Sequence, residues 1–230
     1  MQTPAVESSV EHTSIGRIVV PPNVPRGFRL FYTTIDFDGR IDERIRDFVK
    51  PAPLSSCHQV HGPKVCKAPV NELECDALWS DQKNTALAIK VADCLPVSII
   101  DPKNSVIANI HSGWRGAVRR ITSETIDAIE QSTKFESRDA HAYLGPSIRV
   151  CCFEVGEEVA AQFDESFIDR AHEKPHVDLI AMTIGILRSR GFRDDRIHDS
   201  RACTRCDGSI FHSYRRDSKG GGRNLALAAH

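Results

Sequence analysis

Apolar residues along this chain follow two periods, one typical of strands and one typical of helices. Three apolar segments in the middle of the chain, residues 86–92, 96–101 and 105–110, have the length and the β-branched content of buried strands. We expect them to be core strands of one sheet. Residues 28–34 and 141–145 predict two further strands.

Helical spacing of apolar residues predicts four helices in addition to these strands. The predicted helices cover residues 41–49, 118–129, 156–163 and 180–187. Pro51 would end the first helix, and Gly191 would cap the last one. Together these elements predict an α/β fold.

The first 25 residues have a different character. They are polar and contain Pro21, Pro22 and Pro25, so we expect a flexible N-terminal arm over residues 1–25, with at most one edge strand. Residues 26–230 contain no repeat, low-complexity tract or linker. We therefore expect residues 26–230 to form a single domain.

Charge and hydropathy narrow the classes of partner. Thirty Lys and Arg residues nearly balance 31 Asp and Glu residues, which leaves no basic field to attract nucleic acid or an anionic membrane. No apolar run approaches the roughly 20 residues of a membrane helix, and the N-terminus lacks the pattern of a signal peptide. We expect a cytoplasmic protein without nucleic-acid or membrane partners; the sequence carries no signal for an oligomeric state.

Eight Cys and ten His are the unusual part of the composition. In a reducing compartment, clustered Cys favours metal binding, catalysis or redox chemistry over disulfides. Signatures of Walker-loop ATPases, α/β-hydrolases, zincins and zinc deaminases are missing from the sequence. Cys203 and Cys206 form a bare C-x-x-C pair, for which two reduced thiols near a turn is the favoured interpretation and a metal or redox pair the alternative.

Three short motifs at predicted strand ends carry the chemistry: His58-Gln-Val-His61, Ala92-Asp-Cys94-Leu-Pro and His111-Ser-Gly-Trp-Arg-Gly. Strand ends of an α/β sheet converge on a common crevice, which would bring His61, Cys94 and His111 together. Two imidazoles and a thiolate suit zinc with an open fourth position.

Two other interpretations of these residues stay open. Isolated His and Cys residues are often hydrogen-bonded or buried without a ligand role. Alternatively, Cys94 is a nucleophile, His111 or His61 is its base, and Asp93 or a backbone carbonyl orients the imidazole. The last arrangement would make an acyl-transfer hydrolase without a metal.

The chain also resembles a known family. HQVHG, DALWSD, ALAIKVADCLPV, HSGWRGA, YLGPSI, CCFEVGEEV, ACTRC and FHSYRRD occur in the order typical of the laccase-domain family, over roughly residues 55–224. Its members are named multicopper polyphenol oxidase, purine nucleoside phosphorylase or peptidoglycan editing factor. The resemblance implies one domain of mixed β-sheets flanked by helices, with His61, Cys94 and His111 as zinc ligands and catalytic residues and His58 outside the set of ligands.

The activity that the resemblance implies is phosphorolysis of purine nucleosides (adenosine, inosine, guanosine and methylthioadenosine) together with adenosine deamination. Nucleoside and phosphate would be the small-molecule partners. Copper fits less well than zinc, because blue-copper sites add an axial Met, and neither Met1 nor Met182 lies in these motifs.

Further residues are candidates for substrate and phosphate binding. Arg115 is close to a helix start that favours an anion, and the neighbouring Arg215 and Arg216 have the fork geometry that suits phosphate. Glu154 is a candidate general acid or base, with a helix-start cap as the alternative. Trp114 is a candidate for stacking on a purine or for the core, as are Tyr214 and Phe211. We interpret Cys151 and Cys152 as structural, because neighbours in an extended segment point to opposite sides.

One departure from the family pattern affects specificity. The Gly-rich segment and polar loop that usually follow the first strand are largely missing between Thr34 and the helix at 41–49, which predicts a more open site. The alternatives to a zinc-dependent phosphorylase are a cysteine-type amidase of peptidoglycan precursors, a polyphenol oxidase as the family name suggests, and a metal-binding or interaction protein without enzymatic activity.

Overall fold

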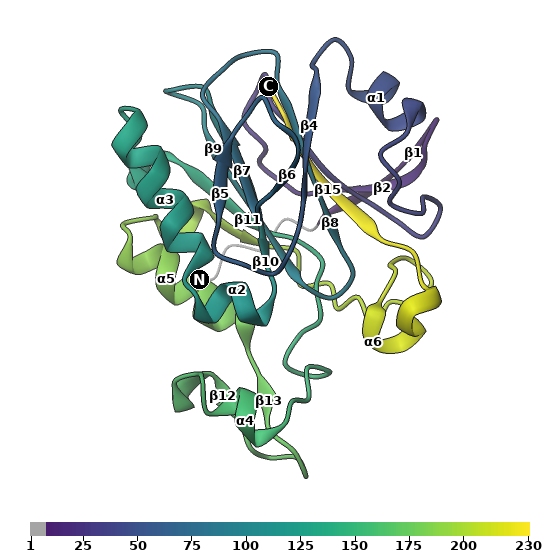
Figure 1. Cartoon of the computed structure of the whole chain (residues 1–230), viewed down its shortest axis with the longest axis vertical. Coiled ribbons are helices and arrows are strands. Elements are labelled where there is room, and N and C mark those ends of the chain that lie inside the picture. The colour runs from purple at the N-terminus through teal and green to yellow at the C-terminus, as the bar shows by residue number, and fades with distance from the viewer. Residues whose placement is uncertain (1–7) are drawn as a thin grey trace.

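Two large mixed β-sheets form the centre of the molecule in a computed structural model that describes residues 8–230 (Figure 1). The seven-stranded sheet has the order β1 (Ser9–Thr13), β2 (Gly16–Val20), β3 (Arg29–Thr33), β15 (Asn224–Ala229), β8 (Ala86–Val91), β4 (Leu54–His58) and β6 (Asn71–Glu74). The six-stranded sheet has the order β14 (Ile197–Asp199), β11 (His141–Leu144), β9 (Leu95–Asp101), β10 (Val106–Ser112), β7 (Ala77–Ser80) and β5 (Val65–Lys67). Each large sheet combines antiparallel and parallel pairs, as the predicted α/β class with mixed sheets requires.

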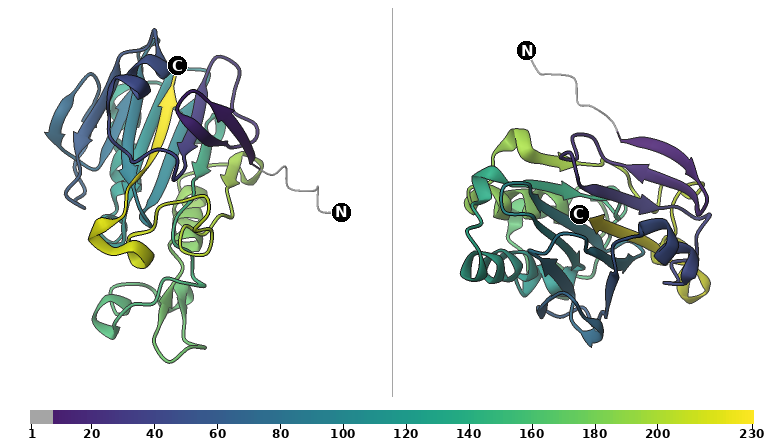
Figure 2. Two further views of the ribbon diagram at one scale, coloured as in Figure 1. Left: turned by 90° about the vertical axis from the view of Figure 1, so that its right-hand side faces the viewer. Right: turned by 90° about the horizontal axis from the view of Figure 1, so that it is seen from above.

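Helices cover the outer faces of both sheets. The helices are α1 (Glu43–Val49), α2 (Trp114–Val118), α3 (Ile121–Ser132), α4 (Glu157–Ala160), α5 (Leu179–Ser189) and α6 (Tyr214–Asp217). In Figure 1, α3 and α5 lie on one side of the sheets and α1 lies on the opposite side. A lobe made of α4, β12 (Ile168–Asp169) and β13 (His176–Val177) extends beyond the sheets (Figure 2).

Side chains alternate between two apolar layers on each sheet. Ile99 of β9 packs under α3 and α5, whereas its neighbour Ile100 packs between the sheets with Ile89 of β8. The seven-stranded sheet places Ala88 on its outer face, in the cluster that includes Ile45 of α1. Because the central strands are buried on both faces, they are continuous apolar runs without polar alternation.

The expectation that residues 86–92, 96–101 and 105–110 share one sheet is wrong. β8 pairs with β15 and β4 in the seven-stranded sheet, whereas β9 and β10 pair with each other in the six-stranded sheet. Burial on both faces gives each strand the same pattern, and that pattern carries no information about the neighbouring strand.

The structure also corrects the N-terminal arm. Residues 9–20 form a β-hairpin, closed at Gly16 with a φ of 100°, and its second strand pairs with β3. Ile15 and Ile18 are buried in the cluster that contains Phe31, so this apolar contact fixes the segment expected to be flexible. Residues 1–7 of the expected arm lie outside the described residues.

The predicted helices are present with changed limits. The helix expected at 118–129 is divided into α2 and α3 by Arg120, which has a left-handed φ of 62°. The helix predicted at 180–187 is α5, and Gly191 follows it with a φ of 88°. In residues 8–230, no helix has the length and hydropathy needed to cross a membrane.

Candidate metal centre

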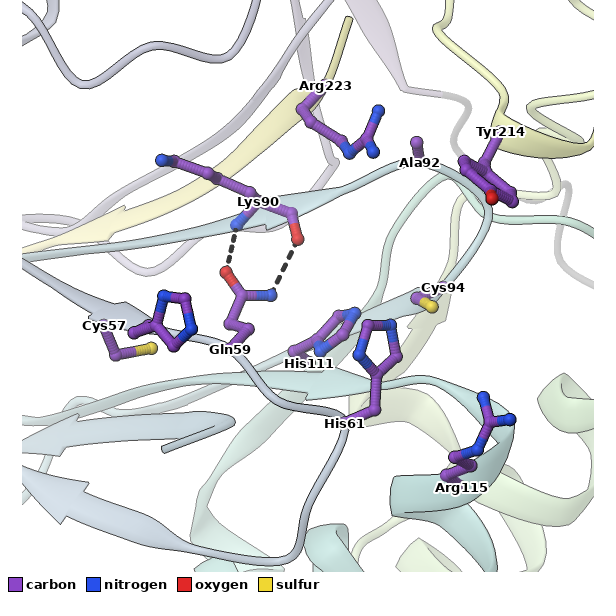
Figure 3. Close-up of a pocket in the computed structure, with 11 residues that line it drawn as sticks. Cys57, Gln59, His61, Lys90, Ala92, Cys94, His111, Arg115, Tyr214 and Arg223 are labelled. Carbon is purple, nitrogen blue, oxygen red and sulfur yellow. Dashed lines mark hydrogen bonds between the residues drawn. The ribbon is translucent and has the colours of Figure 1, made fainter. Parts of the chain in front are cut away.

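His61, Cys94 and His111 come together at one end of the two sheets. His61 follows β4, Cys94 lies in the loop that leads from β8 to β9, and His111 is near the end of β10. One donor atom from each side chain lies within 4.8 Å of the others. Figure 3 shows the two imidazoles and the thiol facing the same space.

A buried carboxylate that was not predicted as a site residue, Asp76 at the start of the DALWSD motif, orients this group. Asp76 is fully buried, and its Oδ1 lies 2.8 Å from Nδ1 of His111. The same carboxylate accepts hydrogen bonds from the backbone N–H groups of Val60, His61 and Gly62 at 3.1, 2.8 and 2.8 Å. With Nδ1 engaged, His111 has Nε2 left for a metal, the arrangement common for metal-binding imidazoles.

The loop around His61 depends on these bonds. His61 has a left-handed φ of 61°, which costs free energy for a residue with a side chain. Three backbone donors to Asp76 offset that cost and fix the direction of the imidazole.

Asp93, which the sequence suggested as the group orienting the imidazole, has another role. Its carboxylate accepts hydrogen bonds from Thr204 Oγ1 and from the backbone N–H of Arg215, each at 2.6 Å. Asp93 therefore connects the Cys94 loop to the C-terminal segments, and Asp76 is the residue that orients His111.

Gly113 leaves the space that the donors need. A Cβ at this position would lie 2.8 Å from Cys94 Sγ and 3.3 Å from Cδ2 of His61. Both distances are shorter than ordinary van der Waals contact, so a larger residue would displace a donor.

The environment favours the charged forms of the cysteine and the histidine. Burial opposes the Cys94 thiolate, but the charge of His111 and hydrogen bonds with His111 and His61 lower the pKa of Cys94 to about 6. Burial also opposes protonation of His111, whereas Cys94 and Asp76 raise the pKa of His111 to about 9. Metal binding requires the thiolate, which this site stabilises.

Two clefts meet at His61 and Cys94, and His111 lines the first of them. The first, of about 560 Å³, is lined by polar side chains that include His58, Gln59, Lys90 and Arg223 (Figure 3). The second, of about 580 Å³, is lined by residues that include Trp114, Ile148, Phe153, Val155 and Val159. His61, Cys94, Arg115 and Tyr214 line both clefts.

The three predicted substrate residues lie on these clefts. Arg115 lies inside the short helix α2, and its Cζ is 4.4 Å from the ring centroid of Trp114. Glu154 and Arg215 line the second cleft, where the Arg215 guanidinium donates to the Glu154 carbonyl at 3.0 Å. A hydrogen bond from Lys174 lowers the pKa of Glu154, which makes this carboxylate a poor proton donor near neutral pH.

Two of the other candidates lie away from the clefts. The Arg216 guanidinium donates to the carbonyl oxygens of Thr204 and Phe211 at 2.9 and 2.8 Å, and therefore supports the local fold. Phe211 is buried between the sheets. Trp114 and Tyr214 have the exposure and position to contact a ligand.

Lys90 and Arg223 add positive charge to the first cleft, and neither was predicted from the sequence (Figure 3). Gln59 orients the Lys90 backbone through two hydrogen bonds of 2.8 Å. Gly39 lies against the Arg223 backbone, where a Cβ would be 2.6 Å from the Arg223 carbonyl oxygen. The segment between β3 and α1 thus supports one wall of this cleft.

Comparisons with known proteins show the family and the fold. The family model described as multi-copper polyphenol oxidoreductase laccase matches residues 40–230. A purine nucleoside phosphorylase of Clostridium acetobutylicum is 34% identical over 159 residues, which cover 67% of this chain and 66% of that protein. The adenosine deaminase RL5, from an unknown prokaryotic organism, is 30% identical over 193 residues, 78% of this chain and 73% of that protein. The chain therefore spans about two thirds to three quarters of the length of these curated relatives.

A solved structure shows the same fold. The crystal structure of YlmD from Geobacillus stearothermophilus has a TM-score of 0.84 and covers 96% of this chain and 98% of its own. The two sequences are 21% identical, so this likeness concerns the fold.

Proposed function

Because the chain belongs to the multi-copper polyphenol oxidoreductase laccase family, we propose that its three-donor site binds zinc and catalyses phosphorolysis of purine nucleosides, with adenosine deamination as a second activity. Convergence of His61, Cys94 and His111 at the junction of two clefts carries this proposal. The names of the relatives supply the substrate class.

The donor set fits zinc better than copper. Two imidazole nitrogens and one thiolate leave a fourth tetrahedral position for a small ligand, as in catalytic zinc sites. Met182, the methionine within the described residues, packs in an apolar cluster with Cys152 and Phe153, away from His61, so no thioether completes a blue-copper site in this region. Zinc held by these residues would supply Lewis acidity toward an oxygen or ring nitrogen of the substrate.

Phosphate has a cationic environment on one side of the donors. Arg115, Lys90 and Arg223 line the first cleft, and their charges favour a dianion beside the reacting carbon. Arg115 lines both clefts, so its guanidinium can hold the phosphate at the junction where phosphate meets the nucleoside.

The nucleoside has an aromatic environment on the other side. Trp114, Phe153 and Tyr214 line the second cleft and offer faces for a purine ring. The Glu154 carboxylate accepts hydrogen bonds and is placed to bind a purine amino group or a ribose hydroxyl, rather than to donate a proton.

Product analysis tests this proposal. Metal-analysed protein is incubated with adenosine, with and without phosphate, and adenine, ribose 1-phosphate and inosine are separated by chromatography. We expect adenine and ribose 1-phosphate only with phosphate, and inosine in both reactions. A folded, zinc-loaded sample that forms none of the three products would refute the proposal.

A cysteine-type amidase is the second candidate function, and the arrangement of three side chains favours it over a polyphenol oxidase. Cys94, His111 and Asp76 are placed as nucleophile, base and orienting carboxylate. Such an enzyme would form a covalent acyl adduct on Cys94 in protein without metal. Mass spectrometry of metal-free protein after incubation with an amide substrate separates the two functions, because the zinc-dependent reaction leaves Cys94 unmodified.

A further inference from the structure

Four cysteine side chains form a second cluster, apart from the His61 site. Cys151 and Cys152 precede α4, and Cys203 and Cys206 lie between β14 and α6. All four sulfur atoms lie within 4.8 Å of one another. Cys206 Sγ is 3.4 Å from the sulfur of Cys152 and 3.9 Å from that of Cys151.

The expectation that Cys151 and Cys152 point to opposite sides is wrong because their segment is a turn. The backbone N–H groups of Cys152 and Phe153 both donate to the Arg149 carbonyl at 2.8 Å. This curvature turns both thiols toward Cys206, a geometry that an extended segment would exclude.

We propose that Cys151, Cys152, Cys203 and Cys206 bind a second zinc ion in a closed, structural site. Zinc–thiolate bonds of about 2.3 Å in a tetrahedron place the sulfur atoms about 3.8 Å apart. The two sulfur separations from Cys206, 3.4 and 3.9 Å, are close to that value. Four thiolates fill the tetrahedron, so this zinc has no open position for a substrate.

Hydrogen bonds hold the two ligand loops together without the metal. Arg149 and Asp199 form a two-bonded ion pair with both distances 2.8 Å. The backbone N–H of Thr204 donates to the Ser147 carbonyl at 3.0 Å. Such outer contacts orient metal ligands.

The exposure of the cluster gives a metal ion a route to the site. Cys151 and Cys206 are exposed, whereas Cys152 and Cys203 are buried. The ion would therefore enter from solvent and be covered on its inner side by the protein, as an accessible structural site requires.

This site would stabilise the second cleft. Phe153 and Glu154 directly follow the Cys151–Cys152 pair and line that cleft. On the other loop, Arg216 donates to the carbonyls of Thr204 and Arg205, which connects the C-x-x-C turn to the helix that carries Tyr214. A zinc ion between the two loops would fix two walls of the cleft relative to each other.

Metal counting in site-specific variants tests the proposal. Wild-type protein, Cys94→Ser and the double variant Cys203→Ser/Cys206→Ser are produced with zinc and purified with a phosphine reductant and no chelator. Cys66→Ser serves as a matched cysteine control outside both clusters. The number of zinc ions per chain is measured by inductively coupled plasma mass spectrometry. The zinc X-ray absorption spectrum is recorded on Cys94→Ser.

We expect Cys94→Ser to keep about one zinc per chain, with an all-sulfur shell at about 2.3 Å. The double variant should hold one zinc fewer than wild type and unfold at a lower temperature, whereas Cys66→Ser should match wild type. The X-ray absorption of Cys94→Ser decides the question if the double variant does not fold.

Three results would overturn the proposal. The first is a Cys94→Ser sample that holds no zinc, and the second is a zinc shell that contains nitrogen or oxygen. The third is wild-type protein, purified without reductant, that is found to hold no zinc and to have disulfides among the four cysteines. None of these measurements uses enzymatic activity, so they do not depend on the nucleoside reaction.

Discussion

Asp76→Asn is the substitution that most sharply separates a positioned metal site from a chance grouping of His and Cys. The amide has nearly the same shape as the carboxylate, but it has one oxygen in place of two and a donor in place of an acceptor. In the native protein, Asp76 Oδ1 accepts from His61 N and lies against His111 Nδ1, while Oδ2 accepts from Val60 N and Gly62 N.

Either orientation of the new amide turns its NH₂ group toward backbone N–H donors. If the NH₂ group faces His111, it also favours the tautomer with the proton on Nε2, the nitrogen needed by the metal. Each charge-assisted hydrogen bond contributes about 1.5–3 kcal/mol, so losing two of them lowers the unfolding free energy by about 3 kcal/mol or more. Loss of an orienting partner weakens metal binding by about 10- to 100-fold.

Alkylation of Cys94 at buffered free zinc concentrations measures affinity at this site alone. Bound zinc protects the thiolate from iodoacetamide, and the Cys94 peptide reports the modified fraction by mass spectrometry. Asp101→Asn is the matched control, because Asp101 is also fully buried and accepts from the backbone N–H groups of Lys103 and Asn104. It lies at the far end of β9, about 20 Å along the strand from Leu95, the residue after Cys94, at 3.4 Å per residue.

We expect both variants to lose stability, and only Asp76→Asn to need about 10- to 100-fold more zinc for protection of Cys94. Equal zinc dependence in Asp76→Asn and wild type would refute the role of Asp76. An equal shift in Asp101→Asn would assign the effect to general destabilisation.

Four further outcomes follow from the geometry. In metal-free protein, the pKa of Cys94 near 6 lies below its usual range, so its alkylation rate should rise through pH 6 and level off by about pH 7. Gly113→Ala should weaken zinc protection of Cys94 by about tenfold or more, because the new methyl group would lie 2.8 Å from Sγ. Arg115→Ala should raise the KM for phosphate about tenfold while adenosine deamination stays within about twofold. Arg216→Ala should lower the unfolding free energy by about 2 kcal/mol, measured by urea denaturation, because two backbone carbonyls lose their donor.

Each of these outcomes has a clear opposite. Alkylation of Cys94 that still rises toward pH 9 would contradict the stabilised thiolate. Unchanged zinc protection of Cys94 in Gly113→Ala would mean that the backbone at residue 113 can move away from Cys94 Sγ, which would contradict the tight fit. Equal losses of phosphorolysis and deamination in Arg115→Ala would remove its assignment to phosphate, and a fully stable Arg216→Ala would contradict its structural role.

The positions of the strands and helices could be predicted from the local sequence pattern, whereas the pairing of the strands could not. Residues 96–101 and 105–110 were predicted as strands because their apolar residues are continuous, and β9 and β10 confirm this. The same continuity hid the fact that β8 belongs to the other sheet, because burial on both faces looks alike in either sheet. The division between α2 and α3 was missed because Arg120 enters the left-handed region without a Gly or Pro to signal it.

In the site, too, the local sequence pattern predicted some residues and missed those whose role depends on distant contacts. His61, Cys94 and His111 were predictable as a group because each occurs at a strand end next to a small or turn-forming residue. Asp76 was missed because its signal is only an acidic residue directly before an apolar strand, and its role depends on contacts 14 to 35 residues away in sequence. Arg215 and Arg216 could not be distinguished from sequence, since adjacent residues of one short helix meet different surroundings.

Zinc titration into metal-free protein, with turnover and Cys94 protection followed in the same samples, tests the central claim most directly. We predict that phosphate-dependent formation of adenine from adenosine and protection of Cys94 rise together and reach their plateaus at the same free zinc concentration. Full adenine formation while Cys94 remains open to alkylation would contradict a zinc-dependent reaction at His61, Cys94 and His111.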